Sequence, residues 1–283
     1  MTEVKASPKK KVREQFKITK ENSKIPKSII ETLSALIEET QLIVTPEGFH
    51  IKAMDPSKAC MISLFIEKEN FDEFECREPC KLSLNLEDFD KILRRSTTND
   101  QLVLSYKEEE QRIKVQIIPE ESMYSRTFSL ALLDIDYEEV PVENLNRIVF
   151  HTKFCLDINF LIQAVKDAEI YSDVFSIKSI QGQGLEFYSL GSIGEMRYKI
   201  SPEDIPNLDL EIIEESCDSF SIDFLKKITK IHTIADTIDI SLRTDHPLKM
   251  EISILEGGEL LYYQAPRAEN DDEALRGDEN NDL

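Results

Sequence analysis

The order of apolar and polar residues predicts many short strands interrupted by a few helices. Apolar residues at helical spacing predict helices over 26–40, 87–95, near 157–168 and near 222–231. A period of two predicts strands such as FHIKAM (49–54), CMISLFI (60–66), QLVLSY (101–106) and RIKVQII (112–118). This pattern is typical of an α+β fold in which helices cover one face of antiparallel sheets.

The chain also repeats itself with an offset of 136 residues. The segment LNLEDFDKILR (84–94) aligns without a gap with FSIDFLKKITK (220–230), and Gly48 aligns with Gly184. A repeat of this extent predicts two similar domains, which we place at 17–133 and 148–267. The stretch between them, 134–147, contains Pro141 and has no sustained periodicity, so we interpret it as a connecting loop.

The charge of the chain changes this picture. There are 34 Lys and Arg against 55 Asp and Glu, and the formal net charge is −21. The polar tails, basic at 1–16 and acidic at 268–283, are predicted to be disordered. Taken alone, the charge argues against a nucleic-acid partner, because Lys and Arg are the residues that neutralise phosphates.

Basic residues nevertheless gather on the predicted helices, opposite their apolar faces. They are Lys27, Lys91, Arg94, Arg95, Lys166, Lys226, Lys227 and Lys230. For a single helix, an ordinary solvated face explains such residues. Two copies related by the repeat, in an acidic chain, favour instead a shared basic surface that tracks phosphates without reading bases.

No residue pattern nominates catalysis or a bound cofactor. The four histidines have no nucleophile or carboxylate placed beside them by a recognisable motif, and no Gly-rich phosphate loop is present. Cys76 and Cys80 are four residues apart without further ligands, so we interpret them as free thiols rather than a metal site. Five cysteines argue against a disulfide framework, and no apolar run is long enough to span a membrane. We therefore expect an intracellular protein that is not an enzyme.

Several segments resemble the DNA sliding clamps of the proliferating cell nuclear antigen family. GFHIKAMDPSKACMISLFI (48–66) and NLEDFDKILR (85–94) are similar to that family's first domain, and LLDIDYEEVPV (132–142) looks like its interdomain connecting loop. KDAEIYSD (166–173) looks like its archaeal second-domain helix, and HPLKMEISILEGGELLYYQAPR (246–267) resembles its terminal strand pair. The resemblance extends from about residue 15 to 267.

The resemblance implies a DNA-clamp fold. Three subunits would form a ring around duplex DNA, with sheets outside and helices lining a central hole, and the eight basic residues would face the DNA. Subunits would join edge to edge through strands near 125–132 and 188–196. The ring would form from identical chains or from paralogues.

The resemblance also implies a hydrophobic pocket for client peptides. The matching positions are Met54, Ala59, Met61, Val140, Val142, Pro247, Tyr263, Ala265 and Pro266. The backbone of 265–267 would pair with the extended part of the peptide. Core packing is the alternative explanation of these apolar residues. The implied clients are DNA polymerase, flap endonuclease, DNA ligase and an ATP-dependent clamp loader.

The function implied is that of a polymerase processivity factor for replication and repair. The alternative is a subunit of a heteromeric or checkpoint-type clamp, which acts as an adaptor without polymerase processivity. An archaeal chain would work in the cytoplasm or nucleoid, and a eukaryotic one in the nucleus. The basic segment PKKKVR (8–13) fits a nuclear localisation signal, a DNA-binding arm or a charge run without a role.

Overall fold

The computed structural model describes residues 14–120, 124–135, 142–203 and 209–267. Its N-terminal half contains β1 (Glu14–Lys20), α1 (Lys24–Leu36), β2 (Glu39–Thr45), β3 (Gly48–Met54), β4 (Cys60–Glu67), η1 (Lys68–Asn70), β5 (Glu73–Cys76), β6 (Cys80–Asn85), α2 (Leu86–Leu93), β7 (Gln101–Lys107), η2 (Glu108–Glu110), β8 (Arg112–Ile118) and β9 (Arg126–Ala131). The short helix α3 (Val142–Leu145) follows.

The C-terminal half repeats this order. It contains β10 (Thr152–Asp157), α4 (Ile158–Ala168), β11 (Val174–Ile180), β12 (Gly184–Gly191), β13 (Gly194–Ile200), β14 (Leu210–Ile212), β15 (Cys217–Ser221), α5 (Ile222–Ile228), η3 (Thr229–Thr233), β16 (Thr237–Leu242), β17 (Leu248–Ser253) and β18 (Gly258–Gln264). The predicted α+β class is confirmed, and none of the helices in the described ranges is long and apolar enough to cross a membrane.

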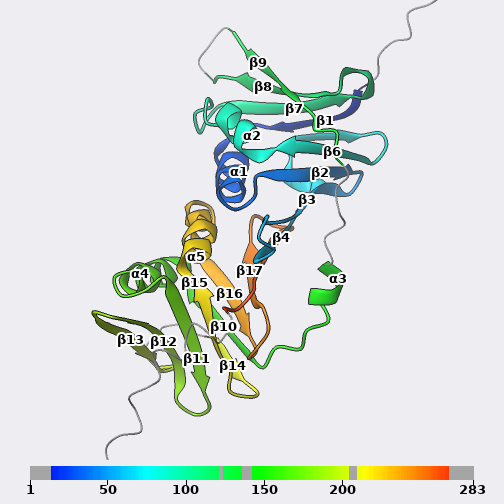
Figure 1. Ribbon diagram of the computed structural model, residues 1–283. Coiled ribbons are helices and arrows are strands. Elements are labelled where there is room, and N and C mark those ends of the chain that lie inside the picture. The colour runs from blue at the N-terminus through cyan, green and yellow to red at the C-terminus, as the bar shows by residue number, and fades with distance from the viewer. Residues whose placement is uncertain (1–13, 121–123, 136–141, 204–208, 268–283) are drawn as a thin grey trace, which may run out of the picture.

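The strands form three antiparallel sheets. One has five strands in the order β5-β1-β7-β8-β9, and one has four in the order β13-β12-β11-β15. The third has nine strands in the order β14-β10-β16-β17-β18-β4-β3-β2-β6, so it contains five strands from the C-terminal half and four from the N-terminal half. The two halves are therefore joined where β18 pairs with β4, with Tyr262 opposite Ile62 (Figure 1).

The repeat seen in the sequence corresponds to equivalent elements. Helices α2 and α5 begin at Leu86 and Ile222, which keeps the offset of 136 residues. A Cβ on Gly48 would lie 2.3 Å from the carbonyl oxygen of Ile66, and one on Gly184 would lie 2.1 Å from that of Ile200. Both glycines thus permit the same close approach of two backbones, which a side chain would prevent.

The helices form one continuous row. Helix α1 packs against α2 on one side and against α5 and η3 on the other, and α4 packs against α5 and η3. Figure 1 shows α2, α1, α5 and α4 following one another along the same side of the sheets. Each helix buries its apolar face; in α1 the buried residues include Ile29, Ile30 and Leu33. The opposite faces therefore share one surface.

The structure corrects two predicted boundaries. The predicted helix 26–40 ends at Leu36, because Ile37 is extended and β2 begins at Glu39 and pairs with β3 and β6. The predicted tail 1–16 is too long, because residues 14–16 belong to β1 and Phe16 is buried in the core. Residues 1–13 and 268–283 lie outside the described residues.

The other three helices lie close to their predictions. Helix α4 matches the predicted 157–168, with the Asp157 carboxylate accepting from the N–H of Asn159 as its N-cap. Helix α2 begins at Leu86 and ends at Leu93, two residues before the predicted end. The segment predicted near 222–231 is α5 continued by the 3₁₀ turn η3.

Candidate DNA-facing helices, peptide pocket and open edges

The helix row differs in charge from the rest of the chain. The segments 24–36, 86–95, 158–169 and 222–233 together carry nine Lys and Arg against seven Asp and Glu. The row is thus slightly positive, by two charges, in a chain whose formal net charge is −21. All eight predicted basic residues lie on this row or directly after one of its helices.

On α2 the basic residues are paired with carboxylates. The Lys91 ammonium nitrogen lies 2.9 Å from a carboxylate oxygen of Glu87 and 3.0 Å from one of Asp88. The hydrogen bond to Glu87, and next that to Asp88, raises the Lys91 pKa. Arg94 lies 2.6 Å from the buried carboxylate of Asp90 and 3.3 Å from Glu31 of α1. Both side chains remain charged, but their charge is largely balanced within the helix pair.

On α5 and its neighbours the pairing is less complete. Lys227 pairs with Asp223 at 2.6 Å, Lys226 with Glu169 at 2.5 Å, and the Lys27 ammonium donates to the Ser96 carbonyl at 3.0 Å. Of the eight predicted basic residues, three are exposed and have no carboxylate within ion-pair distance among the described residues. They are Arg95, Lys166 and Lys230. These three are the best placed to meet an external anion.

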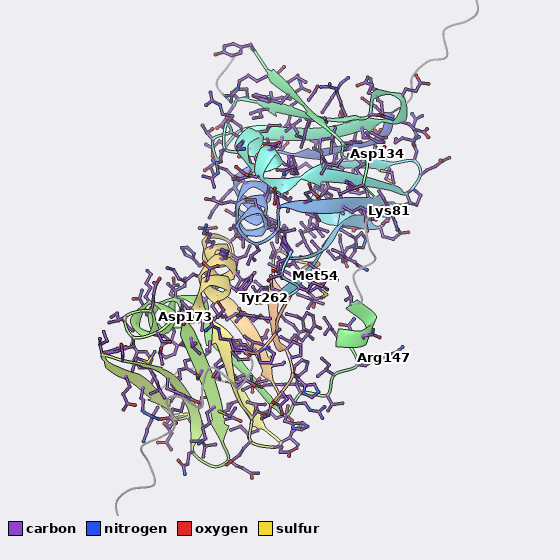
Figure 2. All side chains as sticks on the ribbon, in the orientation of Figure 1. Met54, Lys81, Asp134, Arg147, Asp173 and Tyr262 are labelled. Carbon is purple, nitrogen blue, oxygen red and sulfur yellow. The ribbon has the colours of Figure 1, made fainter. Side chains whose placement is uncertain are left out.

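The predicted pocket residues lie in a small apolar cluster separate from the main core. Its buried members are Met61, Val142, Phe150 and Tyr263, and Met54, Leu145, Ile148 and Leu261 pack against them. Strand register explains the meeting, because Met54 lies opposite Met61, which in turn lies opposite Tyr263. Figure 2 shows Met54 at the junction of the two halves and Arg147 on the segment after α3.

The connecting segment contributes more to this cluster than the sequence indicated. Leu145, Ile148 and Phe150 were not among the predicted pocket residues. Leu145 and Ile148 are spaced by three, the separation of neighbours on one helical face, and this spacing in NLNRIVF is the signal that identifies them.

The hydroxyl of Tyr263 donates to Asn146 Oδ1 at 3.1 Å, and burial raises the Tyr263 pKa to about 12. The phenol therefore stays a donor at neutral pH.

The other predicted residues that the structure describes lie at the ends of β4, β17 and β18, next to the strands that carry this cluster, and we call them its rim. Ala59, Pro247 and Pro266 are half-buried and Ala265 is exposed, whereas Val140 lies outside the described residues. The Ala265 N–H donates to the Ala59 carbonyl at 2.8 Å, and the Arg267 N–H donates to the Ser219 carbonyl at 2.8 Å. These two N–H groups are thus engaged within the chain, so a peptide beside them would use carbonyl oxygens instead.

Within the described ranges each sheet ends in two strands that have a partner on one side only, and two of these six edge strands, β9 and β13, lie near the predicted joining segments. Strand β9 is the last of the five-stranded sheet, which agrees with the expectation for 125–132. The predicted segment 188–196 spans the end of β12, which pairs on both sides, and the start of β13, which is the edge strand of the four-stranded sheet. Phe128 and Leu130 of β9 and Met196, Tyr198 and Ile200 of β13 are at least half-buried at these edges.

The described residues offer little for catalysis. Among them, no group of three or more His, Cys, Asp or Glu side chains is placed to hold a metal ion. The five cysteines are free thiols, and burial raises the pKa of Cys60 and of Cys80 to about 12. A thiol with so high a pKa is a poor nucleophile at neutral pH.

Comparison with known proteins agrees with this geometry. Residues 16–140 match the family model of the proliferating cell nuclear antigen N-terminal domain, and residues 157–267 match that of its C-terminal domain. The chain belongs to the proliferating cell nuclear antigen family. The family resemblance predicted from the sequence is thereby confirmed.

Relatives of similar length support the same family. The chain is 33% identical over 255 residues to the DNA polymerase sliding clamp of Thermococcus gammatolerans, covering 90% of this chain and 99% of the relative. It is 33% identical over 256 residues to that of Pyrococcus furiosus, with the same two coverages. The predicted function of a sliding clamp is confirmed by these relatives.

A solved structure supports the fold. The proliferating cellular nuclear antigen of Entamoeba histolytica matches with a TM-score of 0.79 at 24% identity, covering 90% of this chain and 100% of that chain. Both repeats and their shared sheet are therefore those of the proliferating cell nuclear antigen fold.

Proposed function

We propose that copies of this chain close into a ring around duplex DNA and hold DNA polymerase and other replication and repair proteins on it. The observation that carries the proposal is the junction between β18 and β4. The strand order β14-β10-β16-β17-β18 repeats β5-β1-β7-β8-β9, and the order β6-β2-β3-β4 repeats β15-β11-β12-β13. By this repeat β9 is equivalent to β18, and β13 is equivalent to β4.

The chain therefore has two edge strands, β9 and β13, that are equivalent to the strands β18 and β4, which already pair with each other inside the chain. If β9 of one copy pairs with β13 of the next, the contact has the geometry of the β18–β4 pair. Such a head-to-tail contact is heterologous, and it forms a ring when the rotation closes. The apolar residues Phe128 and Leu130 would continue against Met196 and Tyr198 across the new pair. Three copies would give six similar junctions, half within chains and half between them.

In such a ring the helix row lines the hole. Topological linkage to DNA requires little affinity, and a lining with a small positive charge permits sliding. Arg95, Lys166 and Lys230 would supply the phosphate contacts, with the five paired cations as neighbours. Contacts of this kind carry no sequence information, so binding would be non-sequence-specific.

The apolar cluster beside the connecting segment would receive client peptides. Met54 and Met61 suit several clients because methionine side chains adapt to different shapes. DNA polymerase, flap endonuclease, DNA ligase and an ATP-dependent clamp loader would bind there in turn. The chain would tether these proteins and perform no reaction itself.

Two measurements test the proposal. Size-exclusion chromatography with light scattering at micromolar concentration should give the mass of a trimer. A strictly monomeric chain would contradict the homotrimer, and a trimer that forms only with paralogues would show a heteromeric ring. Primer extension at raised salt, with loader and cognate polymerase, should give longer products when the chain is added. Unchanged product length would contradict the processivity function.

A further inference from the structure

A buried carboxylate lies directly behind the rim of the peptide pocket. Asp55 follows β3 and begins the loop that leads to β4, and it is only 4% exposed. No Lys, Arg or His lies within ion-pair distance of it among the described residues. A buried carboxylate of this kind needs hydrogen-bond donors to offset its lost hydration.

The donors come from the loop itself. Oδ1 accepts the N–H of Cys60 at 2.5 Å, and Oδ2 accepts the N–H of Ser57 at 2.9 Å together with the Ser57 hydroxyl. The Asp55 N–H donates to the Cys60 carbonyl at 3.0 Å, and the Lys58 N–H donates to the Asp55 carbonyl at 2.9 Å. One side chain thus closes the whole loop from residue 55 to residue 60.

This closed loop ends at the contact that fixes the C-terminal segment. Ala59 accepts the Ala265 N–H at 2.8 Å, and Cys60 lies opposite Gln264 in the strand register. Gln264 in turn donates to the Ser221 carbonyl at 3.1 Å. The positions of Ala59, Ala265 and Pro266, which form one side of the pocket rim, therefore depend on the shape of the loop.

The equivalent turn in the other half has no such device. Strands β12 and β13 are joined by Ser192 and Ile193 alone. The longer loop that Asp55 closes is thus present only beside the pocket. The fold therefore does not require this loop, which favours a role for it at the pocket.

We propose that Asp55 is a positioning residue of the client-peptide pocket, which holds the loop 55–60 closed and so places Ala59 against Ala265. The proposal rests on the proposed function of the pocket. Burial, and next the negative charge of Asp55, raise the pKa of Cys60 to about 12, which agrees with a carboxylate enclosed beside that thiol.

The experiment compares Asp55→Ala with three other variants in the full-length chain. The probe is a fluorescently labelled peptide with an aromatic–aliphatic plug, and its affinity is measured by anisotropy. Asp55→Ala should weaken binding about tenfold or more, because it leaves several donors without an acceptor. Asp55→Asn, which keeps one acceptor, should rescue part of the loss, and Ser57→Ala should cost least.

Asp90→Ala is the matched control, because Asp90 is 5% exposed, carries a carboxylate and lies on α2. It should lower thermal stability and leave peptide affinity unchanged. Equal loss of affinity in Asp55→Ala and Asp90→Ala, or unchanged affinity in Asp55→Ala, would overturn the positioning role.

Amide hydrogen exchange tests the positioning role of Asp55 without relying on peptide binding. In Asp55→Ala and Asp55→Asn, the amides of Cys60 and Ala265 should exchange faster while those of β11 and β12 stay protected. If the wild-type chain did not bind the peptide, the proposed pocket would fail, and the exchange result would still decide whether Asp55 positions Ala265. Unchanged exchange at both amides would overturn the proposal.

Discussion

The two halves of this chain share one set of elements but use their outer strands differently. In the N-terminal half β4 is covered by β18, and in the C-terminal half the equivalent β13 is an open edge. The loop before β4 is long and borders the apolar cluster, whereas the loop before β13 is a two-residue turn. The same architecture thus joins the two halves beside the apolar cluster in one half, and leaves an edge strand for the proposed contact between copies in the other.

The helices of the two halves differ in a second way. Helix α2 balances its cations with Glu87, Asp88 and Asp90, whereas in α5 only Asp223 lies on the helix itself. The segment 222–233 carries three Lys against one acid, and the segment 86–95 carries three basic residues against three acids. We therefore expect the segment 222–233 to contribute more than the segment 86–95 to the attraction of DNA.

The largest effect is expected for a substitution in the edge strand β9, and it concerns assembly of the ring. Leu130→Glu in β9 would place a charge in the apolar face of the proposed β9–β13 junction, which costs several kcal/mol when no partner is provided. We expect trimers to dissociate to monomers at micromolar concentration, with association weakened about 100-fold or more. Light scattering with size-exclusion chromatography measures this change.

The control for Leu130→Glu lies on the opposite edge of the same sheet. Phe74 of β5 is also a half-buried apolar residue of an edge strand. Phe74→Glu should keep the trimer mass. Loss of the trimer in both variants would show a general loss of folding, which circular dichroism would reveal, and a trimer of Leu130→Glu would contradict the proposed junction.

The next effect concerns the pocket that only the N-terminal junction has. Tyr263→Ala removes a nearly fully buried ring from the apolar cluster and should weaken client peptides by about 2 kcal/mol, or more than tenfold. Tyr263→Phe removes only the hydroxyl that donates to Asn146, so its effect should be smaller. Calorimetry measures both affinities, with the trimer mass as the control. Equal affinity of the Ala variant and the wild type would remove Tyr263 from the site.

A smaller effect should separate the two helices. Lys230→Glu changes a cation without a carboxylate partner among the described residues, whereas Lys91→Glu changes one already balanced by Glu87 and Asp88. Lys230→Glu should therefore reduce loading onto DNA more and lower the slope of its salt dependence by about one. Loading at several salt concentrations is the measurement. A stronger effect of Lys91→Glu would reverse the ranking of the two segments.

The smallest effect concerns Asp218 of β15, which accepts from the backbone N–H groups of Asp245 and His246. Burial raises the Asp218 pKa to about 6, and Oδ2 has no hydrogen-bond partner. Because the folded pKa of Asp218 lies above its ordinary value of 3.8, the free energy of unfolding of the chain falls as the pH rises from about 4 through about 6. Asp218→Asn should match the wild type below about pH 4 and be more stable near pH 8 by about 1–2 kcal/mol, after allowance for solvent screening.

Denaturant unfolding at several pH values measures the free energies of unfolding of both chains. A difference that does not change between pH 4 and pH 8 would contradict the burial of this carboxylate. The turn 244–247, which Asp218 holds, carries Pro247 of the rim. Because the Asn side chain still offers an acceptor to this turn, Asp218→Asn should leave peptide affinity nearly unchanged at neutral pH.

Local patterns in the sequence predicted most helices and strands, because each element buries one face and its period is visible in the residues. Boundaries failed where two periods overlapped. Ile37 continues the apolar helical spacing of Leu33 and Leu36, yet the chain leaves the helix there, and Thr40 and Leu42 are buried in β2 because sheet pairing outweighs local propensity. Phe16 was assigned to a tail because its neighbours are polar, although pairing with β7 buries it.

The candidate sites were found in part. Met54, Met61, Val142 and Tyr263 were named from the resemblance and do meet, whereas Leu145, Ile148 and Phe150 were missed because their role depends on where the connecting segment folds. The basic positions named from the sequence all lie on the helix row or directly after one of its helices. Which of them are neutralised by neighbouring carboxylates depends on side-chain contacts between helices, such as that of Arg94 with Glu31.

The sequence by itself determined the repeat, the α+β class, the basic helix faces and the family, because periodicity and motif order are properties of the chain. Only the tertiary structure decided which strands remain at open edges, which cations lack a carboxylate and how Asp55 closes the loop beside the pocket. Those outcomes depend on distances between residues far apart in the chain. Strand β18 pairs with β4 across nearly two hundred residues, and that one pairing joins the two halves and is the basis of the proposed contact between copies.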